Sequence, residues 1–134
     1  MPRKVHHLQI ETYNQETASI PAKVAVVEGT SDGQVKLPAG ADAGAFVGFT
    51  SDLGSTTAGD PIEVVTDGVV DVYVKALSTA IVRGDYLSIH GTSGYLKKSA
   101  LTNTGNVVAQ ALESINLDDV VISARIVRCP LPSA

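Results

Sequence analysis

The side chains best suited to chemistry in this chain of 134 residues are three histidines, one cysteine and a group of carboxylates. His6 and His7 are adjacent, so on extended backbone they point to opposite sides, and His90 is far from both in the sequence. Zinc needs several Cys or His ligands at suitable spacing, and a serine nucleophile needs a histidine base. Cys129, in VRCPLP, has no histidine beside it and is expected to be a structural thiol. We therefore expect no metal site and no nucleophilic site.

The carboxylates gather in the middle of the chain. They are Asp52, Asp60, Glu63, Asp67 and Asp71. Two carboxylates can act as general acid and base when a cleft brings them together. Asp60 and Asp67 belong to turn motifs, however, and Glu63 and Asp71 alternate with apolar residues, which directs them to solvent. We expect a solvated acidic face, with no catalytic residue and no cofactor, and hence no enzyme.

The tripeptide Arg83-Gly84-Asp85 is an adhesion signal in other settings, so its role has to be weighed. A second Gly-Asp pair, Gly59-Asp60, also leads into an alternating apolar run. Glycine reaches backbone conformations that other residues avoid, and an aspartate side chain bonds nearby backbone N–H groups. The Gly-Asp pair occurs twice, and an arginine precedes only one copy. We therefore interpret both pairs as turns that lead into strands, and we call them structural corners. A tripeptide match alone is weak evidence for recognition.

Short alternating apolar runs, separated by turn residues, predict strands throughout the chain. The run VVDVYV places Val70, Val72 and Val74 on one face, and the dipeptide Asp67-Gly68 before it is typical of a tight hairpin turn. TSDG and GTSG predict two further hairpins, within residues 22–38 and 86–98. We predict an all-β fold, a small single-domain β-barrel or β-sandwich-like fold of nine or ten short strands with an extended N-terminal arm.

The chain divides into three segments on composition. Residues 1–20 are polar and are predicted to form an arm, residues 21–129 the β-barrel domain, and residues 130–134 a short tail. The arm carries the densest basic cluster, Arg3-Lys4, and little apolar surface to offset its ordering entropy, so we expect it to be mobile in the free protein or ordered only by a neighbouring chain. The alternative is that these residues form an ordinary first strand of the barrel. The net charge of −4 and the scattered basic residues argue against nucleic-acid binding. No apolar run is long enough to cross a membrane, and the start lacks a signal peptide, so we expect synthesis in a cytoplasm.

Four segments, in this order, carry a resemblance to a known family. They are AGDPIEVVTDGVVDVYV, IVRGDYLSIHGTSGYLKKSA, NVVAQALES and VVISARIV. Together they resemble the head-decoration, or capsid cement, proteins of tailed bacteriophages, over residues 20–128 and most clearly over residues 58–128. The resemblance implies a barrel-like subunit, a homotrimer in most such proteins, on the outer surface of a phage head. There it would bridge subunits of the major capsid protein and stabilise the virion.

The resemblance carries no catalytic residue, so the site residues expected here come from the chain itself. We expect the capsid-binding residues to be Arg3, Lys4, Val5, Leu8 and Ile10, and the structural corners to be Gly59, Asp60, Asp67, Gly68, Gly84 and Asp85. Two rival functions stay open. One is a carbohydrate- or cell-surface-binding module, for which only Tyr13, Tyr73, Tyr86 and Tyr95 could form an aromatic platform. The other is a small hydrolase-like barrel that uses the acidic residues.

Overall fold

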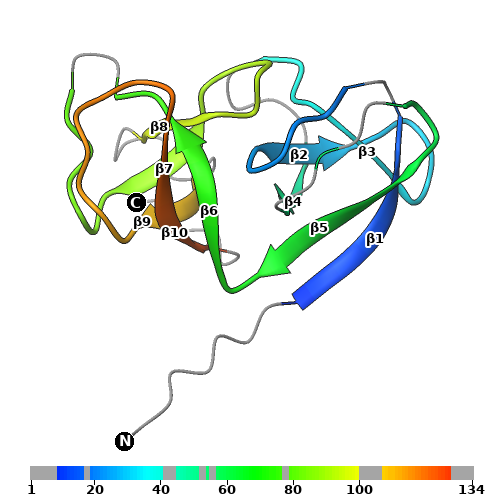
Figure 1. The fold of residues 1–134 in the computed structure, drawn as a ribbon, viewed down its shortest axis with the longest axis horizontal. Coiled ribbons are helices and arrows are strands. Elements are labelled where there is room, and N and C mark those ends of the chain that lie inside the picture. Colours follow the sequence, from blue (N-terminus) through cyan, green and yellow to red (C-terminus); the bar gives the residue numbers. More distant parts are fainter. Residues whose placement is uncertain are drawn as a thin grey trace, which may run out of the picture.

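The computed structural model describes residues 9–16, 19–40, 45–51, 54, 57–76, 79–99 and 107–127. These residues contain ten strands and no helix, which confirms the predicted all-β fold class (Figure 1). The strands are β1 (Gln9–Gln15), β2 (Ala25–Glu28), β3 (Gln34–Lys36), β4 (Phe46–Thr50), β5 (Pro61–Asp67), β6 (Val69–Val74), β7 (Tyr86–Ile89), β8 (Leu96–Lys98), β9 (Val107–Ala111) and β10 (Val120–Ile126).

The strands form two closed five-strand sheets that lie side by side in Figure 1. The first barrel has the strand order β1-β3-β2-β4-β5, and the second has the order β10-β6-β8-β7-β9. Each sheet closes on itself, so the described strands leave no open sheet edge. The sequence predicted one barrel or sandwich, and the structure resolves this into two barrels of five strands each.

The two barrels share one topology. In each, the first strand along the chain pairs antiparallel with the fifth and parallel with the third. The second strand lies between the third and the fourth and is antiparallel to both, and the fourth pairs antiparallel with the fifth. Corresponding strands are about 60 residues apart in the chain. The second barrel therefore repeats the first strand for strand.

The repeat extends to irregular details of the backbone. The pairing of β2 with β4 shifts register between Val26 and Val27, and the pairing of β7 with β9 shifts between Leu87 and Ser88, at the corresponding place. The hairpins β2–β3 and β7–β8, both predicted from the sequence, each turn through one glycine, with φ of 77° at Gly33 and 78° at Gly94. β-Bulges are specific features of a fold, so matching bulges mark a repeat in three dimensions.

One apolar cluster joins the barrels. It contains the inward-facing residues of the second barrel together with Ala25, Val27, Phe49 and Val65 from the first. A smaller cluster fills the first barrel and is made of Ile20, Val24, Val26, Val35, Ile62 and Val64. Successive residues of a strand face opposite sides, so β2 places Val26 inside the first barrel and Ala25 and Val27 against the second. On β5, Ile62 and Val64 lie inside the first barrel and Val65 lies against the second.

The expected arm and the structure differ over residues 9–15. These residues form β1, which pairs with β5 from Gln9 to Asn14 and with β3 at Asn14 and Gln15. The reason is that pairing satisfies the backbone of this polar strand, whereas the prediction weighed only its sparse apolar side chains. This moves the start of the first barrel to Gln9, in place of a boundary after residue 20. Residues 1–8 and the expected tail of residues 130–134 lie outside the described residues.

The dipeptide Asp67-Gly68 is not a hairpin turn, because β5 and β6 do not pair with each other. It carries the chain from the first barrel into the second. Gly68 has a φ of 107°, its N–H donates to Asp67 Oδ1 at 2.9 Å, and its carbonyl accepts from Ile126 N at 2.9 Å. Only glycine adopts this φ at little cost, so a single residue redirects the chain.

Gln15 is an exception in the interior of the first barrel. Its side chain is fully buried, and neither its Oε1 nor its Nε2 has a hydrogen-bond partner in the described part of the chain. The corresponding residue of the second barrel is Val74, because Gln15 pairs with Val35 and Val74 pairs with Leu96 in the same parallel ladder. A buried amide without partners costs about 1–3 kcal/mol. The topology itself therefore does not require an amide at this position.

We expect Gln15→Leu to raise the free energy of unfolding by about 1 kcal/mol, since it removes an unpartnered amide at nearly constant volume. The matched change in the other barrel, Val74→Gln, should lower it by about 1–3 kcal/mol. Urea unfolding followed by circular dichroism measures both. A loss of stability in Gln15→Leu would show that a buried water or another group bonds the amide, contrary to this account.

Candidate functional site

A pocket of about 380 Å³ opens at one end of the first barrel. It lies where β1 and β4 begin and where β2 and β5 end. Its lining residues are Gln9, Glu11, Tyr13, Glu28, Phe46, Val47, Thr66 and Asp67. We call this end of the barrel, defined by those residues, the open end. Its size is at the lower limit for pockets that bind small ligands or single side chains.

The same end of the second barrel is filled by apolar side chains. Glu11 pairs with Val64 and Tyr13 with Ile62, whereas the corresponding pairs of the second barrel are Val70 with Ala124 and Val72 with Ile122. By the same correspondence, the second barrel has the buried apolar residues Ile89 and Ile126 in place of Glu28 and Thr66, and a buried valine, Val108, in place of Val47. The fold thus permits a closed, apolar end, and only the first barrel has a polar opening.

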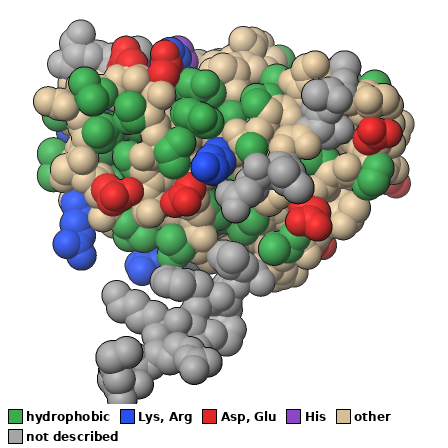
Figure 2. All heavy atoms as spheres, viewed as in Figure 1, with side chains coloured by type: hydrophobic (Ala, Val, Ile, Leu, Met, Phe, Trp, Pro, Cys, Tyr) green, Lys and Arg blue, Asp and Glu red, His purple; other side chains and the backbone are tan. Residues whose placement is uncertain are grey.

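Three carboxylates give the open end a negative charge. They belong to Glu11, Glu28 and Asp67, and none forms an ion pair within the described residues. The Tyr13 hydroxyl donates to Glu11 Oε2 at 3.5 Å, the Gly68 N–H donates to Asp67 Oδ1 at 2.9 Å, and beside them Thr66 Oγ1 donates to the Gln9 carbonyl at 3.2 Å. Figure 2 shows acidic side chains spread over both barrels on one face, with the basic ones standing singly.

The sequence did not single out this site. The described mid-chain carboxylates, Asp60, Glu63, Asp67 and Asp71, are all exposed, and of these Asp67 lines the open end. Asp52 and Cys129 lie outside the described residues. The signal that locates the site is the contrast between two barrels of one topology, and that contrast becomes visible only when the strand pairing is known. Among the described residues, no group of three His, Cys, Asp or Glu side chains is arranged to hold a metal ion.

The predicted capsid-binding residues fall mainly outside the described part of the chain. Arg3, Lys4, Val5 and Leu8 are among residues 1–8, which are not described. Ile10 lies on β1 and is 49% exposed, on the opposite face of the strand from Gln9 and Glu11. β1 begins at Gln9, which lines the open end, so residues 1–8, with Arg3 and Lys4, come directly before this site in the chain.

Both Gly-Asp pairs lie in the same kind of four-residue turn. Asp60 N donates to the Thr57 carbonyl at 3.2 Å, and Asp85 N donates to the Val82 carbonyl at 2.9 Å. The third residue of each turn is glycine, with φ of 86° at Gly59 and 98° at Gly84, as a turn with a left-handed third residue requires. The Asp85 carboxylate also accepts from Val82 N at 2.8 Å and lies 3.6 Å from Lys98 Nζ.

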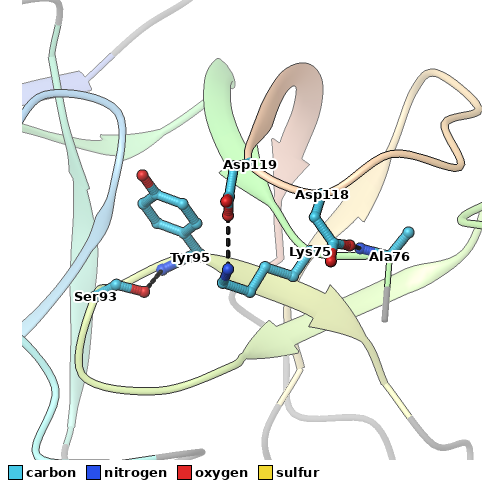
Figure 3. A network of polar contacts seen from close by, with 6 residues as sticks. All are labelled: Lys75, Ala76, Ser93, Tyr95, Asp118 and Asp119. Atoms are coloured by element: carbon cyan, nitrogen blue, oxygen red, sulfur yellow. Dashed lines mark hydrogen bonds and ion pairs between the residues drawn. The ribbon is translucent and has the colours of Figure 1, made fainter. Parts of the chain in front are cut away.

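A polar network ties the loop before β10 to β6 and β8 (Figure 3). Lys75 Nζ lies 2.6 Å from Asp119 Oδ1 and 5.5 Å from the centre of the Tyr95 ring, and Asp118 Oδ1 accepts from Ala76 N at 2.8 Å. The Tyr95 ring stacks on Tyr73 at 5.0 Å, and both rings pack against the core of the first barrel. The Asp119 carboxylate raises the pKa of Lys75, chiefly through its hydrogen bond. The polar contacts lie within the second barrel, and the two tyrosine rings link it to the core of the first.

Comparison with known proteins gives a likeness of fold. No family model matches the chain, and no curated protein matches it. Among solved structures, the chain is similar to the N base of head fiber gp8.5 of bacteriophage phi29. The TM-score is 0.61 and the sequence identity is 15%, and the match covers 94% of this chain and 99% of the other. At this identity the likeness is one of fold, and it extends over nearly the whole of both chains. No helix of the described residues is long and apolar enough to cross a membrane.

Asp85→Ala should lower the free energy of unfolding by about 0.5–2 kcal/mol, because the Val82 N–H loses its side-chain acceptor. Arg83→Ala should change the free energy of unfolding by less than about 0.5 kcal/mol, because the Arg83 side chain is exposed and takes no part in the turn. Thermal denaturation of the two variants compares them directly. If Arg83→Ala abolished binding to a partner while stability stayed constant, the tripeptide would be a recognition element.

Asp119→Asn should lower the pKa of the Lys75 amine toward the ordinary lysine value, because the hydrogen-bonded carboxylate is lost. The folded-state pKa is raised, so the stabilisation from this pair is complete below the ordinary lysine pKa and is lost as the pH rises through the raised value. An NMR titration of the lysine amines measures the shift. An unchanged Lys75 pKa in the variant would contradict the assigned cause.

Proposed function

We propose that this chain is a structural protein of a tailed-phage virion. It binds the outer surface of the head and stabilises the head by bridging subunits of the major capsid protein. The observation that carries the proposal is the likeness of fold to a phage head fiber base over nearly the full length of both chains. The resemblance of four sequence segments to head-decoration proteins points to the same place on the virion.

The proposed role is binding and not catalysis. The open end presents carboxylates, amide and hydroxyl groups and two aromatic rings, and among the described residues neither a histidine nor a cysteine lines it. His90, the one histidine among the described residues, lies in the turn between β7 and β8, where its backbone N–H donates to the Tyr95 carbonyl. A purely binding role needs no convergent acid, base or nucleophile, and it accounts for the available groups.

The proposed head-binding residues are Arg3, Lys4, Val5, Leu8 and Ile10. Ile10 supports this role, because an isoleucine that is 49% exposed gains about 25 cal/mol for each Å² of apolar surface that a partner covers. Assembly as a homotrimer belongs to the proposal on the resemblance alone. Open sheet edges do not motivate it, because both described sheets are closed.

A carbohydrate-binding function is the alternative, and the tyrosines give it less support. Tyr13, Tyr73, Tyr86 and Tyr95 are all half-buried. Tyr73 and Tyr95 stack on each other between the barrels. A sugar platform needs an aromatic face open to solvent, and the Tyr73 and Tyr95 rings cover one face of each other.

The test is binding to phage heads that lack this protein. The full chain should bind such heads saturably and raise the temperature at which they lose DNA. Deleting residues 2–8 should weaken head binding by at least about tenfold while leaving the melting temperature of the protein nearly unchanged, since this segment precedes β1. Deleting residues 2–15 serves as the control for folding and should unfold the first barrel, because it removes β1. Heads that take up the full chain no better than an unrelated protein would refute the proposed function.

A further inference from the structure

In each barrel the first and third strands pair along a line that we call the seam, between β1 and β3 in the first barrel and between β6 and β8 in the second. One hydrogen bond of the seam is the same in both barrels. Glu16 N donates to the Val35 carbonyl at 2.9 Å, and Lys75 N donates to the Leu96 carbonyl at 2.8 Å. These two bonds fix which residues of the two seams correspond.

Two residues earlier on each strand, the seams differ. In the first barrel Asn14 N donates directly to the Gly33 carbonyl at 2.8 Å. The corresponding residues of the second barrel are Tyr73 and Gly94, and each of them bonds to a third segment instead. The difference also appears in the strand pairing, because β1 and β3 pair at two positions whereas β6 and β8 pair at one.

The third segment belongs to the first barrel and consists of residues 23–25, which we call the inserted segment. Tyr73 N donates to the Lys23 carbonyl at 3.0 Å, and the Gly94 carbonyl accepts from Ala25 N at 2.8 Å. A carbonyl and an N–H two residues apart on extended backbone thus bond to both sides of the opened seam. One hydrogen bond of the first barrel is replaced in the second by two, so the fold already contains a seam that holds an extended segment.

The two turn glycines of the seams show the same contrast. Gly33 and Gly94 have nearly equal φ, 77° and 78°. Gly94 is buried, and a side-chain carbon added there would lie 2.7 Å from the Ala25 carbonyl oxygen. Gly33 is exposed, and a side-chain carbon added there would touch nothing within 4 Å. Asn14, across the seam, is exposed as well. The same backbone position is covered by an inserted segment in one barrel and open in the other.

We propose that the seam of the first barrel, between Asn14 and Gly33, binds an extended segment of a partner protein in the way that the second seam holds residues 23–25. Asn14 N–H turns from Gly33 to a carbonyl of the partner segment, and the Gly33 carbonyl accepts from the N–H two residues later. One bond is exchanged for two, and main-chain groups provide the recognition, as in other cases of strand addition. Glycine at position 33 leaves room for the partner backbone.

A partner of another sequence is favoured over a second copy of this chain. The counterpart of the inserted segment in the second barrel is residues 84–86, since Gly84 N donates to the Ala111 carbonyl as Lys23 N donates to the Thr50 carbonyl. The Gly84 carbonyl, which would have to enter the seam, already accepts from Gln110 Nε2 at 3.1 Å. The proposal goes beyond the proposed function, and its test uses no phage head, so either can fail without the other.

The experiment is an NMR titration of the full-length ¹⁵N-labelled protein with the capped pentapeptide Ala-Lys-Val-Ala-Val, the sequence of residues 22–26. The peptide should shift the amide signals of Asn14 and Gly33 saturably. The control peptide carries an N-methyl group on its second alanine, which removes the N–H that would donate to Gly33. It should bind at least about tenfold more weakly. Light scattering of the protein alone tests for a second copy as the occupant.

Two glycine variants make the test specific. Gly33→Asn keeps a residue type that tolerates left-handed backbone, and its added side chain should block the segment while the melting temperature stays nearly unchanged. It should weaken peptide binding at least about tenfold. Gly84→Asn is the matched control, because Gly84 has a φ of 98° and open space around it but lies outside the seam, and it should leave the affinity unchanged.

Saturable shifts at the seam that need the peptide N–H and Gly33 support the proposal. It is overturned if neither Asn14 nor Gly33 shifts saturably, if the N-methyl peptide binds equally well, or if the two glycine variants have equal effects. Self-association of the protein that Gly33→Asn abolishes would also overturn it, because the occupant would then be a second copy of the chain.

Discussion

Closure of each five-strand sheet on itself is the constraint on which the rest of this structure depends. Ten short strands, several of only three or four residues, satisfy their backbones by completing two rings. Closure is what allows β1, a strand with one half-buried and one buried side chain in seven residues, to be part of the barrel. Closure also divides the interior into two compartments, and each compartment can then be filled in its own way.

The two compartments are filled differently. The second barrel has an apolar interior that continues into the outer face of the first and so forms the main core. The first barrel has a smaller apolar cluster, an unpartnered amide at Gln15 and an opening lined by carboxylates. Most of the described apolar core therefore belongs to the second barrel and to its contact with the first.

The strands and tight turns were predictable from the sequence because they depend on local rules. Alternation placed Val70, Val72 and Val74 on one face, and glycine-containing turns located the hairpins β2–β3 and β7–β8. Sheet partners could not be predicted in the same way, since pairing is a long-range property. Asp67-Gly68 has the composition of a hairpin turn, yet its flanking strands pair elsewhere. The two Gly-Asp pairs, interpreted as local corners, do not mark the repeat, because they precede β5 and β7, which are not corresponding strands. The true repeat was hidden because rows such as Glu11-Tyr13-Gln15 and Val70-Val72-Val74 have no residue type in common.

The open end became visible only through that repeat, because no single residue in it is unusual. Its carboxylates come from strands that are distant in the chain, and a reading along the sequence treats each of them as an ordinary surface residue. The central claim of this account is the proposal that this chain binds the outer surface of a phage head. A density map of heads that carry this protein tests it most directly. The account predicts density for this two-barrel chain on the outer surface of the head, in contact with more than one subunit of the major capsid protein. A map without such density, or one in which the chain contacts no capsid subunit, would contradict it.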